Sequence, residues 1–122
     1  MPHCIIEYSN GIEKYINPQL MIDAVYKGAL TSELFEDEDI KTRAIAYDYY
    51  QTGALKKEFV HVTLKILTGR SLAQKIKLSE LVINQLEKID FQSTVITVDI
   101  VEMEKDTYSK INKITVNNQR EG

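Results

Sequence analysis

The sequence of 122 residues predicts one domain of the α+β or α/β class, with two βαβ units forming a four-stranded sheet and two helices on one face of it. Three observations predict this fold. A strand-helix-strand order occurs twice, over about residues 2–52 and 57–104, as in an internal duplication. Residues 58–67 alternate between apolar and mixed positions, which is typical of a strand with one buried face. A capping-box spacing at residues 71–74 precedes a helical apolar stripe.

The first unit begins with a strand from Pro2 to Tyr8, because apolar and β-branched residues there end at the turn cluster Ser9-Asn10-Gly11. Asn17 is the expected cap of a helix that begins at Pro18, where a missing N–H costs nothing. The helix should extend to about Leu30. Its expected buried stripe comprises Leu20, Met21, Ala24, Val25 and Gly28.

An acidic run over residues 33–39 separates this helix from the next strand and predicts a solvated loop. A metal site there is the weaker interpretation, because no histidine accompanies the carboxylates. Aromatic and β-branched residues over 40–51 predict the second strand. Thr52-Gly53-Ala54 then turns the chain into the second unit.

The third strand covers Glu58 to Leu67, with its even-numbered residues expected in the core. Ser71 and Gln74 form the predicted capping box of the second helix. Its expected apolar stripe comprises Leu72, Ile76, Leu78, Ser79, Val82, Ile83, Leu86 and Ile89. Residues 93–103 predict the fourth strand, and residues 105–122 an arm whose Ile111, Ile114 and Val116 could add a strand or dock on a neighbour.

Two helices on one face would leave the other face of the sheet uncovered. The neighbourhood of Tyr47, Tyr49, Phe59 and His61 on that face is too apolar to favour contact with water. A symmetric oligomer with the sheets facing inward would cover it, and a homotrimer is the expected assembly.

Composition excludes several function classes. With 43% hydrophobic and 27% charged residues the sequence predicts a globular domain, and no apolar run approaches the length of a membrane span. The net charge of -3 argues against nucleic-acid binding. Cys4 is the single cysteine, so we expect no disulfide and a cytoplasmic location, and the N-terminus does not resemble a secretory signal. Cys4 itself is expected to be a small buried hydrophobe rather than a nucleophile.

Pro2 follows the initiator methionine at the head of the first strand. If Met1 is removed, the Pro2 nitrogen becomes a secondary amine on a rigid ring, which is a general base made without a side chain. Proline at this position is common, so the observation alone is weak.

The sequence resembles the 5-carboxymethyl-2-hydroxymuconate Δ-isomerase family of the tautomerase superfamily, to which 4-oxalocrotonate tautomerase also belongs. The residues that carry the resemblance are Pro2, Arg43, the run 59–66 and Gly69-Arg70-Ser71-Leu72. The resemblance covers about residues 2–110. It implies a tautomerase fold, a trimer of two-unit subunits, and active sites lined by residues of adjoining units.

The resemblance also implies the chemistry. Pro2 would carry the proton, and Arg43 and Arg70 would bind the oxygens of an unsaturated keto or enol diacid, without a metal or organic cofactor. Family members often have an arginine where this chain has Lys41, which keeps the charge but loses the planar fork that grips a carboxylate. Family members often have an aromatic residue shortly after this position, and Tyr47 is its counterpart here. Lys41 and Tyr47 are therefore candidate substrate-binding residues beside Arg43 and Arg70.

Each residue also has a simpler interpretation. Arg70 at a helix start could be solvated, although Gly69 and the Ser71 cap place it beside helix-end N–H groups that favour an anion. Arg43, Lys41 and Lys65 could simply face solvent. His3 and His61 alternate within strands, so packing or hydrogen bonding is expected before acid-base catalysis.

Three hypotheses follow from the sequence. The leading one is a carboxymethyl-hydroxymuconate type of isomerase. A second is a phenylpyruvate-type tautomerase, or a hydratase or dehalogenase that acts on an unsaturated acid. The third is a trimeric binding module without catalysis, which retention of Met1 would favour because Pro2 would then be an amide.

Overall fold

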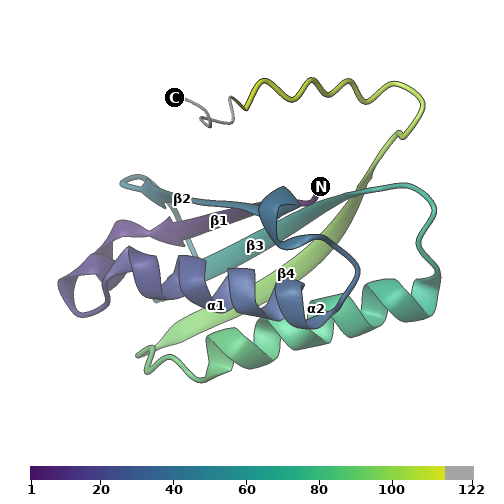
Figure 1. Ribbon diagram of the computed structural model, residues 1–122. Coiled ribbons are helices and arrows are strands. Elements are labelled where there is room, and N and C mark those ends of the chain that lie inside the picture. The colour runs from purple at the N-terminus through teal and green to yellow at the C-terminus, as the bar shows by residue number, and fades with distance from the viewer. Residues whose placement is uncertain (115–122) are drawn as a thin grey trace, which may run out of the picture.

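The computed structural model describes residues 1–114, which form a sheet covered by helices and end in an extended arm (Figure 1). Val116, expected to help the arm add a strand or dock, lies outside the described residues. The strands are β1 (His3–Ser9), β2 (Lys41–Tyr47), β3 (Glu58–Leu67) and β4 (Thr94–Met103). The helices are α1 (Pro18–Thr31) and α2 (Leu72–Glu87), with 3-10 helices η1 (Asn10–Lys14) and η2 (Asp37–Asp39).

The four strands form a single mixed sheet in the order β2-β1-β3-β4. β1 is parallel to β2, β3 is parallel to β4, and the two units meet where β1 and β3 pair antiparallel. Both helices lie on the same face of the sheet (Figure 1). The predicted pair of βαβ units is therefore confirmed.

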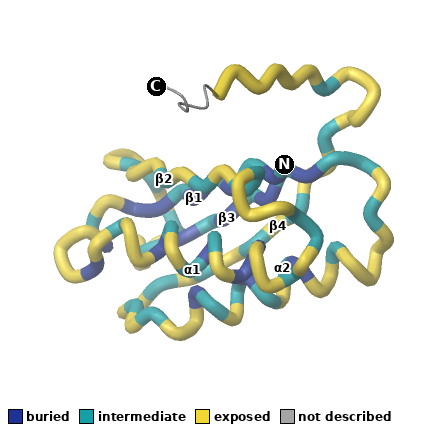
Figure 2. Tube along the Cα trace, in the orientation of Figure 1, coloured by how far each residue is buried: buried dark blue, intermediate teal, exposed yellow. Residues whose placement is uncertain are grey.

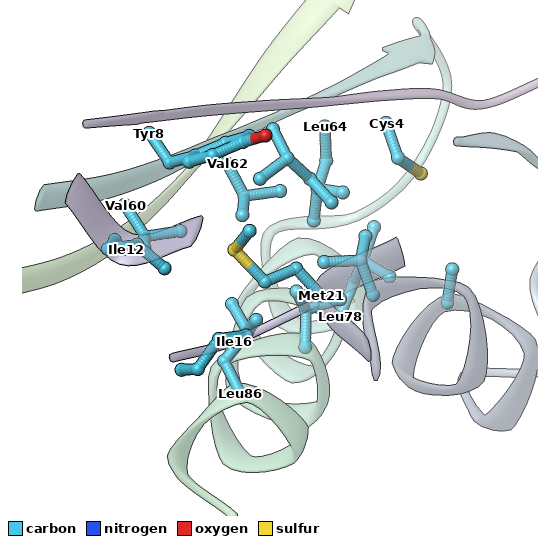
Figure 3. Packing of buried hydrophobic residues seen from close by; sticks show 14 of the residues in the cluster. Cys4, Tyr8, Ile12, Ile16, Met21, Val60, Val62, Leu64, Leu78 and Leu86 are labelled. Atoms are coloured by element: carbon cyan, nitrogen blue, oxygen red, sulfur yellow. The ribbon is translucent and has the colours of Figure 1, made fainter. Parts of the chain in front are cut away.

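The core lies between this face and the two helices, and its side chains pack in one layer (Figure 3). Alternate residues of the central strands, dark blue in Figure 2, point into it. From β1 and β3 these are Cys4, Ile6, Tyr8, Val60, Val62, Leu64 and Ile66, and from the helices Met21, Val25, Ala29, Leu78, Val82 and Leu86. The expectation that Cys4 is a buried hydrophobe is confirmed.

The helix starts follow the local sequence signals. The Asn17 side chain accepts a hydrogen bond from the Gln19 backbone N–H at 3.0 Å, with Pro18 as the first helical residue. The Ser71 hydroxyl accepts from the Gln74 N–H at 3.1 Å, and the Gln74 side chain accepts from the Ser71 N–H at 2.8 Å. Both caps satisfy backbone donors that the first helical turn leaves unpaired.

Three residues expected in the buried helical stripes are exposed. Leu20 is 51% exposed, because the buried stripe of α1 is centred on Met21, Val25 and Gly28. Leu72 and Ile76 are 71% and 50% exposed, because the first turns of α2 border an open groove beside the edge strand β4. The apolar stripes were therefore predicted wider than the sheet can cover.

The predicted second strand was also too long, because β2 ends at Tyr47 rather than at residue 51. Among the described residues, β2 is an edge strand whose single neighbour is β1, and Tyr47 pairs with Ser9, the last residue of β1. Beyond Ser9 the chain turns into η1, a helix that the sequence analysis missed and that buries Ile12. β2 therefore ends where its partner ends.

The opposite face of the sheet carries an aromatic cluster. Phe59 lies 6.1 Å from Tyr47 and 5.6 Å from Tyr50 between ring centroids. Tyr49 was expected in this neighbourhood, but it follows the end of β2 and is 93% exposed. Across residues 1–114, neither helix combines the length and apolar composition needed to cross a bilayer.

Candidate functional site

Pro2 lies at the head of β1 and is fully buried. Its carbonyl oxygen accepts a hydrogen bond from the Lys41 N–H at 3.1 Å, which extends the pairing of β1 with β2 by one step. Met1 precedes it, and the Met1 amine donates to the Asp39 carbonyl oxygen at 3.1 Å. The N-terminus is therefore fixed between β2 and the η2 segment.

A surface pocket of about 430 Å³ opens at this N-terminus. Its walls come from four separate parts of the chain: the terminus, the segment after α1, the β3–α2 turn and the arm after β4. The lining residues are Met1, Leu34, Phe35, Glu36, Asp39, Leu67, Arg70, Tyr108 and Lys110. The pocket thus combines apolar side chains with two cationic side chains and two carboxylates next to the terminal amine.

Arg70 is held in this pocket rather than extended into solvent. Its Nη2 donates to the Leu34 carbonyl oxygen at 2.7 Å, and its guanidinium carbon lies 5.5 Å from the centroid of the Phe35 ring. Gly69 supplies the turn before it with a φ of +120°, a conformation that side chains rarely adopt. The helix-end N–H groups of Ser71 and Gln74 are taken by the capping box, so they are not free for an anion.

Arg43 and Lys41 lie on β2 and are exposed. Arg43 Nη1 lies 3.2 Å from His3 Nδ1, and His3 Nε2 lies 2.9 Å from the Tyr108 hydroxyl. Lys41 Nζ donates to the Asp39 carbonyl oxygen at 3.2 Å. Arg43 therefore reaches the pocket through His3 and Tyr108, while Lys41 borders the segment that holds the N-terminus.

Within one chain, Tyr47 lies far from Pro2, at the opposite end of β2. It stands six residues beyond Lys41 on β2, which corresponds to about 20 Å along a strand. Its hydroxyl donates to the Glu7 carboxylate. His61, on the same face of the sheet, has its Nδ1 2.7 Å from the Thr97 hydroxyl, so the expected hydrogen-bonding role of both histidines is confirmed.

The surroundings of the N-terminus disfavour added positive charge. Partial burial lowers the pKa of the Met1 amine; Asp39 opposes this effect, and Lys41 and Lys110 add to it. The pKa of His3 is also lowered, first by burial and then by the Arg43 charge. Both groups are therefore biased toward their neutral forms.

The sequence analysis missed Phe35, Tyr108 and Lys110 as site residues. They lie in irregular segments, where no apolar period marks a face. Lys110 forms an ion pair with Asp39 at 3.2 Å, and the arm up to this point packs beside the chain's own N-terminus. The described part of the arm, residues 105–114, contains no strand, and its Ile111 and Ile114 are exposed.

Other candidate sites are less well equipped. A pocket of about 480 Å³ between α2 and β4 is larger, but of the described residues Glu80, Asp99 and Glu102 line it beside Lys75 alone, so its carboxylates outnumber its cations and disfavour an anionic ligand. Within residues 1–114, no group of three or more His, Cys, Asp or Glu side chains could hold a metal ion.

A four-stranded mixed sheet built from two parallel pairs, with two helices on one face, is a tautomerase-like fold. The chain belongs to the 5-carboxymethyl-2-hydroxymuconate isomerase family, whose family model matches residues 2–117. The members of this family are isomerases. A comparison with curated proteins gave no sequence match.

Solved structures agree with this fold. A 5-carboxymethyl-2-hydroxymuconate delta-isomerase superposes with a TM-score of 0.78 at 16% identity, covering 92% of this chain and 89% of the other. A 5-carboxymethyl-2-hydroxymuconate isomerase from Deinococcus radiodurans R1 gives 0.75 at 22% identity, covering 92% and 90%. The Q0 fused 4-OT, described as a wild-type symmetric trimer, gives 0.61 at 14% identity, covering 93% and 94%.

Proposed function

We propose that the protein is an isomerase that moves a proton and a double bond in an unsaturated 2-hydroxy or 2-oxo diacid such as 5-carboxymethyl-2-hydroxymuconate. Pro2 is the general base, after removal of Met1. The observation that carries the proposal is that Met1, the residue joined to the Pro2 nitrogen, lines a pocket that also holds Arg70, so removal of Met1 would leave the Pro2 amine beside that pocket. Membership of the isomerase family supports the reaction class.

The reaction requires a base, a stabiliser for negative charge, and a place for the product proton. The Pro2 amine takes a proton from the substrate oxygen or from the carbon beside the double bond. The electron pair moves through the conjugated chain as a dienolate, and the protonated amine returns the proton to a different carbon. The proton that the amine removes is the proton that it returns, so atoms and charge balance. The isomerisation therefore needs no added reagent.

The pKa of the base must be near neutrality for this exchange. An N-terminal amine has an ordinary pKa of about 7.7–8.0 and a proline amine is more basic. Partial burial lowers the pKa of the Met1 amine, and Pro2 is buried more deeply than Met1. We therefore expect burial to lower the pKa of a terminal Pro2 as well, with Asp39 opposing this effect and the charges of Lys41 and Lys110 adding to it.

The carboxylates of the substrate are assigned to the surrounding cations. Arg70 is the primary anchor, because its guanidinium is already oriented by Leu34 and Phe35 and retains further N–H donors. Arg43 and Lys41 bind the second carboxylate from the β2 side. The Lys41 ammonium acts there as a point charge, whereas a guanidinium would bind the carboxylate through two parallel hydrogen bonds. The orientation of the second carboxylate is therefore less strictly defined.

The active assembly is a homotrimer in which the uncovered face of the sheet is buried. The Tyr47–Phe59–Tyr50 cluster supports this, because a contiguous apolar patch is unfavourable in water. The likeness to a structure described as a symmetric trimer also supports it. Tyr47 would then belong to the site of a neighbouring subunit. Light scattering after size exclusion should give three times the mass of the chain, and a monomer at micromolar concentration would contradict the assembly.

The decisive experiment starts with intact mass, which must show that Met1 is absent. Ketonisation of a 2-hydroxymuconate diacid is then followed by ultraviolet absorbance for the wild type, Pro2→Ala and Pro18→Ala. Pro2→Ala should lower kcat about 10²-fold, the scale of general acid-base catalysis. Pro18→Ala is the matched control, since Pro18 begins α1 away from the pocket. Equal rates for wild type and Pro2→Ala would refute the proposal, and activity on 2-oxo monoacids alone would replace the diacid with another substrate class.

A further inference from the structure

Tyr108 is held beside the N-terminus by several independent contacts of the C-terminal arm. The Thr68 N–H donates to the Met103 carbonyl oxygen at 3.0 Å, and the Lys105 N–H donates to the Thr68 hydroxyl at 3.3 Å. Two residues beyond Tyr108, Lys110 pairs with Asp39 at 3.2 Å. These contacts lie on both sides of Tyr108 in the sequence, so they fix the position of its ring in the pocket wall.

The contacts of His3 define the direction of its hydrogen bond to Tyr108. A guanidinium only donates, so the Arg43 Nη1 at 3.2 Å requires His3 Nδ1 to be the acceptor. A neutral imidazole with Nδ1 as acceptor carries its proton on Nε2. That nitrogen lies 2.9 Å from the Tyr108 oxygen and therefore donates to it.

The consequence concerns the proton of the Tyr108 hydroxyl. Because its oxygen accepts from His3, its own O–H remains available as a donor within the part of the chain that the structure describes. The lowered pKa of His3, caused first by burial and then by Arg43, agrees with a neutral imidazole at neutral pH. Tyr108 lines the same pocket as Met1 and Arg70.

We propose that the Tyr108 hydroxyl donates a hydrogen bond to the C2 oxygen of a 2-oxo or 2-hydroxy diacid bound in the pocket next to the N-terminus, and that His3 is a positioning residue that orients this hydroxyl. The inference rests on the proposed function. Proton removal next to a carbonyl places negative charge on that oxygen, a few ångströms from the base. Tyr108 lines the pocket and is hydrogen-bonded to His3, the residue that directly follows Pro2, so it brings a neutral donor close to the expected position of the base.

The first test measures binding and needs no turnover. Affinities for 2-oxoadipate and for adipate, which differ only at the C2 oxygen, are measured by calorimetry for the wild type, Tyr108→Phe and Tyr49→Phe. The wild type should prefer 2-oxoadipate, and Tyr108→Phe should lower that preference about threefold to tenfold, the scale of one neutral hydrogen bond. Tyr49→Phe removes the same atom from an exposed tyrosine and should leave both affinities unchanged.

Three outcomes of this binding test would overturn the inference. An unchanged preference in Tyr108→Phe would mean that the hydroxyl does not meet the C2 oxygen. An equal loss of affinity for both diacids would indicate a structural role. A wild type that binds neither diacid would remove the ligand class altogether.

The second test separates His3 from Tyr108 and uses ketonisation of a 2-hydroxymuconate diacid. Tyr108→Phe should lower kcat about 10-fold to 100-fold with little change in KM, because a donor to a developing oxyanion acts mainly in the transition state. His3→Gln retains an amide donor and should keep most of the activity, while His3→Ala should approach the rate of Tyr108→Phe.

Equal activity of His3→Ala and the wild type would overturn the positioning role. If the wild type shows the binding preference but no ketonisation, the proposed function fails and the assignment of Tyr108 stands. The two claims are therefore distinguishable.

Discussion

The close approach of the two helices depends on Gly28, and Gly28→Ala tests how rigid that approach is. A Cβ at this position would lie 2.7 Å from the Val82 Cα and 2.9 Å from the Leu81 carbonyl oxygen. Ordinary contact begins at 3.4 Å, so the helices would have to separate locally by several tenths of an ångström. The obstructing atoms belong to the backbone of α2, and no side-chain rotation can move them.

Two effects of opposite sign determine the size of the change. Overpacking of a core costs about 1–3 kcal/mol. Alanine in place of glycine inside a helix contributes about 1 kcal/mol in the other direction. We expect a net loss of about 1 kcal/mol in the free energy of unfolding, or about 4 °C in Tm for a domain of this size.

The assay is urea denaturation at one fixed protein concentration, with Lys27→Gly and Lys27→Ala as matched controls. Lys27 is exposed on the same helix at the neighbouring position, so the difference between its two variants measures the alanine preference of α1 alone. Adding that preference to the loss in Gly28→Ala yields the packing cost. If Gly28→Ala gains the full preference measured at Lys27, the helices separate without cost and the reasoning is refuted.

Two further predictions concern titrating groups. Folding lowers the pKa of His3 below its ordinary value of 6.5. Between these two pKa values the unfolded chain binds more protons than the folded protein. The free energy of unfolding therefore decreases as the pH is lowered from 6.5 to the folded-state pKa. Melting curves at pH 7.5 and 5.5 should therefore show a larger loss of Tm for the wild type than for His3→Gln, and equal losses would contradict the lowered pKa. Burial raises the pKa of the Cys4 thiol to about 11, so the folded protein should not react with an aromatic disulfide reagent at pH 8 until denaturant is added. Fast reaction of the native protein would show that Cys4 is accessible.

Much of the fold follows from local sequence signals. The alternation from Glu58 to Leu67 predicted β3 with its observed bounds, because a strand with one buried face repeats every two residues. The capping residues Asn17 and Ser71 predicted both helix starts, because a side chain must satisfy the unpaired N–H groups there. Such signals depend on near neighbours in the chain, so they can be recognised without the fold.

Local signals therefore specify the four strands, the two α-helices and the positions of Pro2 and Arg70 at element ends, but not η1. Tertiary structure decided where β2 stops, since an edge strand ends with its partner, and which irregular segments meet at the N-terminus. The contact between His3 and Tyr108 joins residues 105 positions apart, and the arm that carries Tyr108 has no period to predict its place. The site needs groups from distant segments at a distance of a few ångströms, and only the folded chain brings them together.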